Sequence, residues 1–277
     1  KPRPFQRKRK QLLIVMMGLF IAPIWRFIMD DQTLQEMAKA LRLSGISETL
    51  MARLDQAKAS SLAYEELLLM LFQDELQSKN QQGLLRRVSQ ARFEEAKSLE
   101  DFDLKRYSTN VIQAIRSLMT GSFLKENNHI IIMGPVGTGK THLAQGLGVL
   151  ACQRNKKVHF VRANDLLNKF HQSRADETWN KVFSAYTKYD VLILDDFGLK
   201  SFSPEQSSDL YDLIAALHIK STLIITTNRK LESWSDLFYD PVMGNAALDR
   251  VANKAYRIIL DGDSYRKKFI PKFGLET

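Results

Sequence analysis

The chain has 277 residues, 44% of them apolar and 26% charged, which suits a soluble globular protein with one large domain or a core domain and a small companion. Its single cysteine, Cys152, excludes an internal disulfide, and with only five scattered histidines we expect no Cys/His metal cluster. The formal charge of +9 does not by itself indicate nucleic-acid binding. Seven of these charges fall within the first 28 residues, which contain no acidic residue, leaving +2 for the remainder.

Residues 1–29 form a leader that is first basic (KPRPFQRKRK) and then apolar. The apolar stretch, residues 12–25, contains Gly18 and Pro23 and is shorter than the roughly 20 residues that a membrane-spanning helix needs. No small-x-small cleavage site follows it. Two interpretations stay open: an anchor that leaves the rest of the chain in the cytoplasm, or residues that precede a natural start at Met29. The chain does not begin with Met, which favours the second, so we expect a cytoplasmic protein without a membrane partner.

Residues 30–95 have the pattern of a small all-α domain. Helix-forming residues predominate, proline is absent, and Leu34, Met37, Ala38 and Leu41 recur at helical spacing. No catalytic constellation is present there, so we expect a domain that interacts with a partner. Residues 96–128 are predicted to be a linker followed by one amphipathic helix.

The pattern changes after residue 128. Short apolar runs at 129–133, 158–161, 191–194, 222–226 and 256–260 alternate with helical patterns. This alternation predicts repeated strand–helix units around a parallel sheet, whose strands are nearly continuously apolar because both faces are covered. The sequence therefore predicts an α/β domain over residues 129–277.

The stretch GPVGTGKT matches the phosphate-binding pattern G-x-x-x-x-G-K-[ST] in full, between a predicted strand and a predicted helix. Its backbone N–H groups and Lys140 are expected to hold the phosphates of ATP, and Thr141 to offer its hydroxyl to Mg²⁺. The side chain of His142 is expected to pack or to lie on the surface. We assign nucleotide binding to Gly134, Pro135, Val136, Gly137, Thr138, Gly139, Lys140, Thr141 and His142.

Two carboxylates follow a buried strand in VLILDDFG, where open α/β sheets place their ligands. Asp195 is predicted to lie on the Mg²⁺ side, and Asp196 to polarise the attacking water. Many such ATPases have Glu at the second position, so we expect slow hydrolysis that DNA or a partner stimulates. Asn228, at the end of the next strand in LIITTNRK, could orient the water, although Asn at a strand end is also a common turn residue.

The ordered set GPVGTGKTHLA, RANDLLNKF, VLILDDFGL, TTNRKLESW, ALDRV and GDSYR resembles the IstB family of AAA+ transposition helper ATPases, relatives of DnaC-type helicase loaders. The stretches LAYEELLLMLFQDEL and LLRRVSQARFEEAKSLEDFDL resemble IstB proteins more than the loaders. The likeness covers most of residues 33–266. It implies an AAA+ P-loop core with five parallel strands in the order five-one-four-three-two, preceded by the small all-α domain.

The resemblance also implies roles for single residues. Arg250 in ALDRV corresponds to an arginine finger that completes the ATP site of a neighbouring subunit, and Arg266 in GDSYR to a second sensor. The alternatives are a local pair with Asp249 or another nearby acid for Arg250 and a plain surface position for Arg266. The region NDLLNKFHQSRADETWNK would face DNA, with contacts from Lys169, Arg174 and Lys181, unless it is only a solvated helix face.

The predicted function is an ATP-dependent helper that forms a homo-oligomer through ATP at subunit junctions, assembles on duplex DNA and recruits or activates a transposase. A replicative helicase loader of the DnaC type is the alternative. A small-molecule kinase is a third possibility, but the two aspartates, Asn228 and Arg250 fit hydrolysis better.

Overall fold

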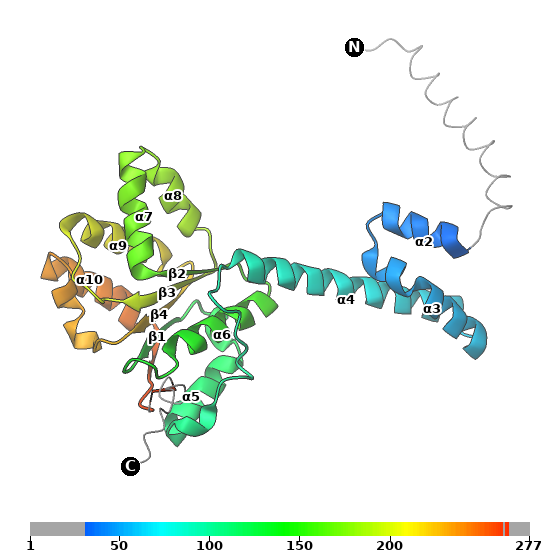
Figure 1. The fold of residues 1–277 in the computed structure, drawn as a ribbon, viewed down its shortest axis with the longest axis horizontal. Helices are drawn as coiled ribbons and strands as arrows, with labels where there is room; N and C mark the ends of the chain where they lie inside the picture. The colour runs from blue at the N-terminus through cyan, green and yellow to red at the C-terminus, as the bar shows by residue number, and fades with distance from the viewer. Residues whose placement is uncertain (1–30, 263, 266–277) are drawn as a thin grey trace, which may run out of the picture. The chain divides into compact units, whose positions relative to one another are not determined.

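The computed structural model describes residues 31–262, 264 and 265, so the predicted leader and Arg266 lie outside the described residues. The chain divides between Gly83 and Leu84 into two compact units, and this division falls before the predicted boundary at residue 95. The first unit contains α2 (Asp31–Ala40), α3 (Ser44–Ser60) and most of α4 (Tyr64–Gln90) (Figure 1). None of the helices among the described residues is long and apolar enough to cross a membrane.

A close approach of backbones joins α3 to α4. A Cβ on Gly45 would lie 2.4 Å from the carbonyl oxygen of Asp74, so only glycine fits at this crossing. Beside it, Arg53 Nε donates to Asp74 Oδ2 at 2.8 Å, and this guanidinium is the main cause that lowers the pKa of Asp74 to about 2. These contacts, with buried Leu50 and Leu71, hold the two helices together.

The second unit is built on a parallel sheet. Its strands are β1 (His129–Met133), β2 (Val158–Arg162), β3 (Val191–Phe197), β4 (Thr222–Thr227) and β5 (Ala255–Ile259), in the order β2-β3-β4-β1-β5. Every neighbouring pair is parallel. The predicted five-stranded parallel sheet and its strand order are confirmed.

Helices cover both faces of this sheet (Figure 1). They are α5 (Thr109–Met119), α6 (Lys140–Gln153), α7 (Ala163–Ala175), α8 (Trp179–Tyr186), α9 (Pro204–Leu217) and α10 (Pro241–Ala252). Because successive strand residues point to opposite faces, Ile130 and Ile132 pack with Leu143 of α6 in one core, whereas Ile131 packs with Leu213 of α9 in the other. Because all strands are parallel, their carboxyl ends lie at the same end of the sheet, next to the loop that follows β1.

The predicted linker packs into the core of the second unit. Phe102, Tyr107, Ile115 and Phe123 are all buried in the core that contains α6. Short 3-10 turns at η1 (Leu104–Arg106) and η2 (Ser122–Leu124) lie on either side of α5. The segment that follows α4 is therefore held against α6, the helix that begins at the predicted phosphate-binding loop.

Candidate nucleotide-binding site

The phosphate-binding loop needs its glycines for two separate reasons. Gly137 (φ 84°) and Gly139 (φ 89°) occupy the left-handed region, which side chains other than glycine rarely adopt. At Gly134, a Cβ would lie 2.3 Å from the carbonyl oxygen of Leu260, which follows β5. The loop leads directly into α6 at Lys140, so the positive end of that helix and its free N–H groups border the cavity, as an anion site requires.

Lys140 is 6% exposed, and its Nζ donates to the carbonyl oxygen of Pro135 at 2.7 Å. This bond turns the ammonium group back over the loop, where a bound phosphate would lie. The predicted phosphate-binding residues are therefore brought together around one cavity.

Asp195 is held at the end of β3 by two hydroxyl groups. Thr141 Oγ1 donates to its carboxylate at 3.0 and 3.1 Å, and Thr226 Oγ1 donates at 2.6 Å. The carboxyl is 2% exposed, and burial raises its pKa, while the hydroxyl hydrogen bonds act in the opposite direction. An all-oxygen pair of hydroxyl and carboxylate is the donor set that Mg²⁺ prefers, and a cation there would offset the cost of burying the charge. Thr141 and Asp195 therefore fit the predicted metal role.

Asp196 has an unusual backbone. Its φ of 54° is in the left-handed region, at an irregularity in the pairing of β3 with β4, and its N–H donates to Thr226 Oγ1 at 3.0 Å. Such a conformation is costly for a residue other than glycine and is frequent at functional sites. It places Asp196 in the wall of the same cavity as Asn228.

An aromatic group from the predicted linker closes the other side of the loop. Phe102 stacks on Tyr107 with centroids 5.4 Å apart and meets the ring of His142 edge-on at 5.2 Å. The Tyr107 hydroxyl donates to the carbonyl oxygen of Thr138 at 2.6 Å. The half-buried side chain of His142 thus packs against Phe102 and also lines the cavity. Tyr107, which the sequence did not single out, holds the loop.

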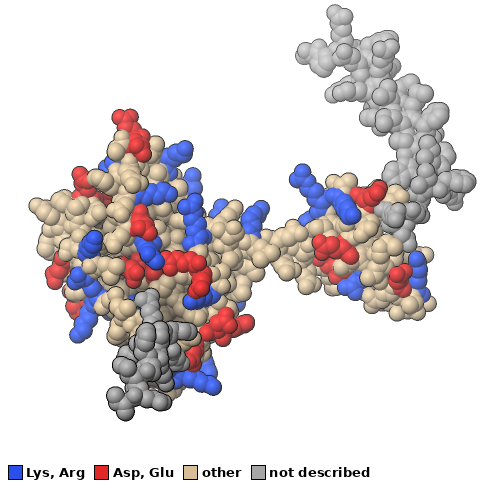
Figure 2. Space-filling view, viewed as in Figure 1, with Lys and Arg blue, Asp and Glu red and all other residues tan. Residues whose placement is uncertain are grey.

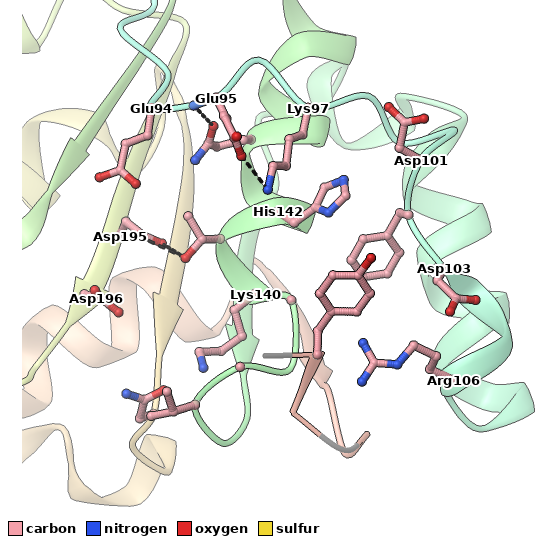
Figure 3. A pocket seen from close by; sticks show the side chains of 18 of the residues that line it. Glu94, Glu95, Lys97, Asp101, Asp103, Arg106, Lys140, His142, Asp195 and Asp196 are labelled. Carbon is pink, nitrogen blue, oxygen red and sulfur yellow. Dashed lines mark hydrogen bonds and ion pairs between the residues drawn. The ribbon is translucent and has the colours of Figure 1, made fainter. Parts of the chain in front are cut away.

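The cavity formed by these elements measures about 930 Å³ (Figure 3). An ion pair that the sequence did not predict lies in the wall of this cavity. Nη2 of Arg162, the last residue of β2, is 2.6 Å from Glu94 Oε1. Arg162 is in register with Asp195, so this pair lies beside the metal-side carboxylate. Besides residues already named, the cavity is lined by Glu95, Lys97, Asp101, Asp103, Arg106, Val136, Gln145, Leu199 and Tyr265.

Arg250 does not line this cavity. Its guanidinium lies 4.7 Å above the ring of Tyr211 on α9, and its Nη1 is buried without a hydrogen-bond partner among the described residues. The suggested pair with Asp249 does not form; Asp249 accepts from Asn253 instead. A buried guanidinium nitrogen without a partner is costly, so the hydrogen-bonding capacity of Arg250 is not fully used within the described residues.

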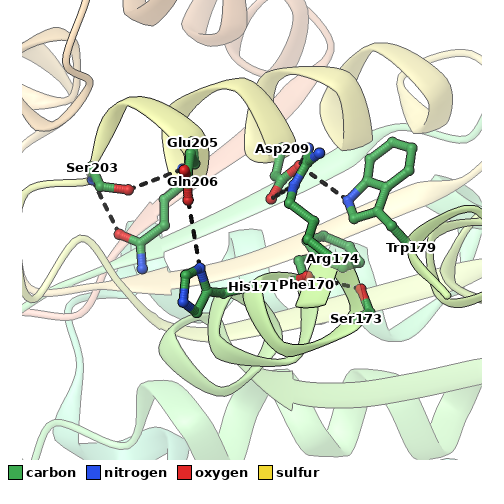
Figure 4. A network of polar contacts seen from close by, with 9 residues as sticks. All are labelled: Phe170, His171, Ser173, Arg174, Trp179, Ser203, Glu205, Gln206 and Asp209. Carbon is green, nitrogen blue, oxygen red and sulfur yellow. Dashed lines mark hydrogen bonds and ion pairs between the residues drawn. The ribbon is translucent and has the colours of Figure 1, made fainter. Parts of the chain in front are cut away.

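The residues predicted to contact DNA differ in their surroundings, and Figure 4 shows those of Arg174. Arg174 is paired with Asp209 and lies 4.8 Å above the ring of Trp179, whose Nε1 also donates to Asp209 at 3.1 Å. The guanidinium of Arg174 therefore has a partner inside the protein, which the sequence analysis did not foresee. Lys169 and Lys181 are exposed, with Lys169 Nζ 5.5 Å from the ring centroid of Tyr186.

Comparison with known proteins agrees with this geometry. The family described as IstB-like ATP binding protein matches residues 36–271. An insertion-sequence ATP-binding protein of Mycobacterium tuberculosis is 36% identical over 242 residues, covering 87% of this chain and 96% of that protein. The IS21 insertion-sequence ATP-binding protein of Pseudomonas aeruginosa is 30% identical over 244 residues, with 88% and 92% covered.

Solved structures show the same fold at low identity. The DnaC helicase loader gives a TM-score of 0.52 at 19% identity, covering 61% of this chain and 98% of that one. AMPPCP-bound DnaA from Aquifex aeolicus gives 0.53 at 22% identity, with 67% and 57% covered. The expected AAA+ P-loop fold is confirmed.

Proposed function

The chain belongs to the family of IstB-like ATP-binding proteins, and we propose that it is an ATP-hydrolysing helper that assembles on duplex DNA and recruits or activates a transposase. The observation that carries the ATPase part is the joint placement of Lys140 and Asp195 in one cavity, beside a phosphate-binding loop. The names of its relatives, ATP-binding proteins of insertion sequences, support the transposition part.

The chain's own residues divide the work of hydrolysis. Backbone N–H groups of the loop and Lys140 bind the phosphates, and Asp196 orients and polarises the attacking water with help from Asn228. Thr141 and Asp195 hold Mg²⁺, which when bound neutralises charge on the phosphate oxygens. Because Asp196 has a shorter side chain than the Glu of many ATPases, hydrolysis is slow until DNA or a partner adjusts the geometry.

Arg250 acts on the ATP of a neighbouring copy. Its guanidinium lies outside its own nucleotide cavity, so a γ-phosphate that it contacts would belong to the ATP of another copy. ATP bound between two copies contacts both of them and favours the assembled state, and hydrolysis removes the phosphate that Arg250 holds. The nucleotide thereby times assembly on DNA.

DNA binding depends on local groups of cations. Figure 2 shows Lys and Arg interspersed with Asp and Glu on the face in view, so a broad basic surface is not what attracts DNA there. Exposed Lys169 and Lys181 on α7 and α8 are the proposed contacts, and binding through them tolerates changes of DNA sequence and weakens as salt rises.

Mixing two inactive variants tests the shared site. Lys140→Ala removes phosphate binding and Arg250→Ala removes the finger, so neither hydrolyses ATP alone, whereas a mixture restores part of the activity. Arg116→Ala, at an exposed arginine that does not line the nucleotide cavity, serves as the control and stays active. A mixture without activity, from a protein that stays monomeric with ATP and duplex DNA, refutes the proposal. Stimulation by single-stranded DNA and a replicative helicase instead would identify a helicase loader.

A further inference from the structure

A second cavity, of about 360 Å³, lies where α4 ends and β2 begins. Its walls contain Arg87, Arg92 and Lys157, together with Tyr189, Gln90 and Val158. No carboxylate of the described residues lines it, and it shares no residue with the nucleotide cavity. Three cations around one hollow attract a ligand with several negative charges.

The backbone fixes these cations in place. The N–H of Phe160 on the edge strand β2 donates to the carbonyl oxygen of Ala91 at 2.8 Å, which anchors the chain just before Arg92. Asp190 accepts from the backbone N–H of Lys157 at 2.7 Å, so this carboxylate is engaged by the main chain and not by the ammonium group. Arg92 and Lys157 are exposed and form no ion pair with any residue in the described part of the chain. Arg87 differs, because its Nε donates to the carbonyl oxygen of Cys152 at the end of α6.

A row of rings connects this cavity to Lys169. Lys169 lies over the ring of Tyr186, whose centroid is 5.3 Å from that of His159, and His159 stacks on Tyr189 at 4.7 Å. Burial first, and then the charges of Arg92 and Lys169, lower the pKa of His159 to about 4. Arg92 and Lys169, at the two ends of the row, are therefore both close enough to His159 to disfavour its protonation.

We propose that Arg92 and Lys157, together with Lys169 on the other side of the buried rings, bind phosphates of the DNA backbone. This inference rests on the proposed function, since it locates the DNA contact of the helper. Exposed Lys and Arg side chains without acidic partners are the groups that hold DNA phosphates independently of sequence. Inorganic phosphate or a free nucleotide shares this chemistry and is separated from DNA by the test.

The test uses the full chain with a non-hydrolysable ATP analogue and a fluorescent duplex, titrated between roughly 50 and 200 mM salt. Arg92→Gln/Lys157→Gln removes two phosphate contacts, so the slope of log K against log salt becomes shallower by about 1.8, because each contact contributes about 0.9. Arg116→Gln/Lys125→Gln makes the same change of charge at exposed positions outside both cavities and leaves the slope unchanged. Hydrolysis of ATP without DNA stays at the wild-type rate in both variants.

The outcomes separate the two proposals. If the wild-type protein binds duplex DNA and the Arg92/Lys157 variant keeps the full slope, the inference is wrong while the proposed function stands. If the wild type binds no DNA with any nucleotide, both fail. Calorimetry with inorganic phosphate gives a third measurement. If the wild type binds phosphate, and the Arg92/Lys157 variant loses this binding but keeps its DNA affinity, the cavity binds a small anion and the inference is wrong.

Discussion

Replacing Arg174 with methionine separates a structural role from DNA contact. The carboxylate of Asp209 is 3% exposed and is held by the guanidinium of Arg174 and by Trp179 Nε1. In Arg174→Met it keeps only the indole N–H and cannot reach water. A hydrogen bond to a charged group contributes about 1.5–3 kcal/mol, and a cation above an exposed ring about 0.5–1 kcal/mol. Because the Arg174 side chain is 43% exposed, we take a loss near the lower end, about 2 kcal/mol.

Thermal unfolding followed by circular dichroism measures this loss. For a unit of this size each kcal/mol lowers Tm by about 2–4 °C, so Arg174→Met is expected to melt about 4–8 °C below wild type. Lys181→Met, at an exposed lysine on the neighbouring helix, is the matched control and should stay within about 0.5 kcal/mol of wild type. Arg174→Met/Asp209→Asn should recover part of the loss, because the uncompensated buried charge is gone. A variant that melts like the control but binds DNA more weakly would refute the structural role and restore the DNA contact first expected of Arg174.

Three further predictions concern ionisable groups of the second unit. Burial in the fold raises the pKa of Asp195, so the folded state loses stability as pH rises through the ordinary range of an aspartate and this carboxyl ionises. Asp195→Asn should therefore raise the Tm of the nucleotide-free chain at neutral pH while abolishing Mg²⁺-dependent hydrolysis. A lower Tm would contradict this. Burial lowers the pKa of His159 to about 4, so the neutral imidazole contributes its full stability above the ordinary pKa of 6.5, and this stability declines as pH falls towards 4. In urea titrations at several pH values, His159→Phe should flatten that decline. An unchanged pH profile would count against this reasoning. Arg162→Gln leaves Glu94 unpaired in the wall of the nucleotide cavity, so a fluorescent ATP analogue should bind more weakly. Adding Glu94→Gln in the same chain should restore the binding. Wild-type binding by the single variant would show that the pair has no such role.

The sequence alone was sufficient to predict the sheet and the phosphate-binding loop because both depend on local patterns. Apolar runs of strand length, separated by helical patterns, imply parallel strands, and the loop's glycines and Lys140 are adjacent in the chain. The order of the strands came from family resemblance and not from periodicity. The position of Asp195 at the cavity end of β3 could be predicted for a similar reason, since it directly follows an apolar run.

The contacts that were missed join residues far apart in the sequence. Tyr107 and Thr138 are separated by 31 positions, and Arg174 and Asp209 by 35. Nothing in the neighbourhood of Arg174 distinguishes an arginine that pairs with a buried carboxylate from one that faces solvent. Lys169 is exposed, which fits both a DNA contact and a solvated helix face, so its DNA contact stays a prediction.

The segment that follows α4 borders both the nucleotide cavity and the basic cavity proposed to contact DNA. Arg92 lines the basic cavity, and Glu94, Phe102 and Tyr107 line the nucleotide cavity, so a single short stretch of chain borders both. Tyr107 holds the phosphate-binding loop directly, and Glu94 pairs with the residue that precedes α7, the helix that carries Lys169. A shift of this stretch when ATP binds would change both surfaces together. Since coupling between two binding equilibria is reciprocal, an ATP-induced gain in DNA affinity requires that DNA increase the affinity for ATP by the same factor.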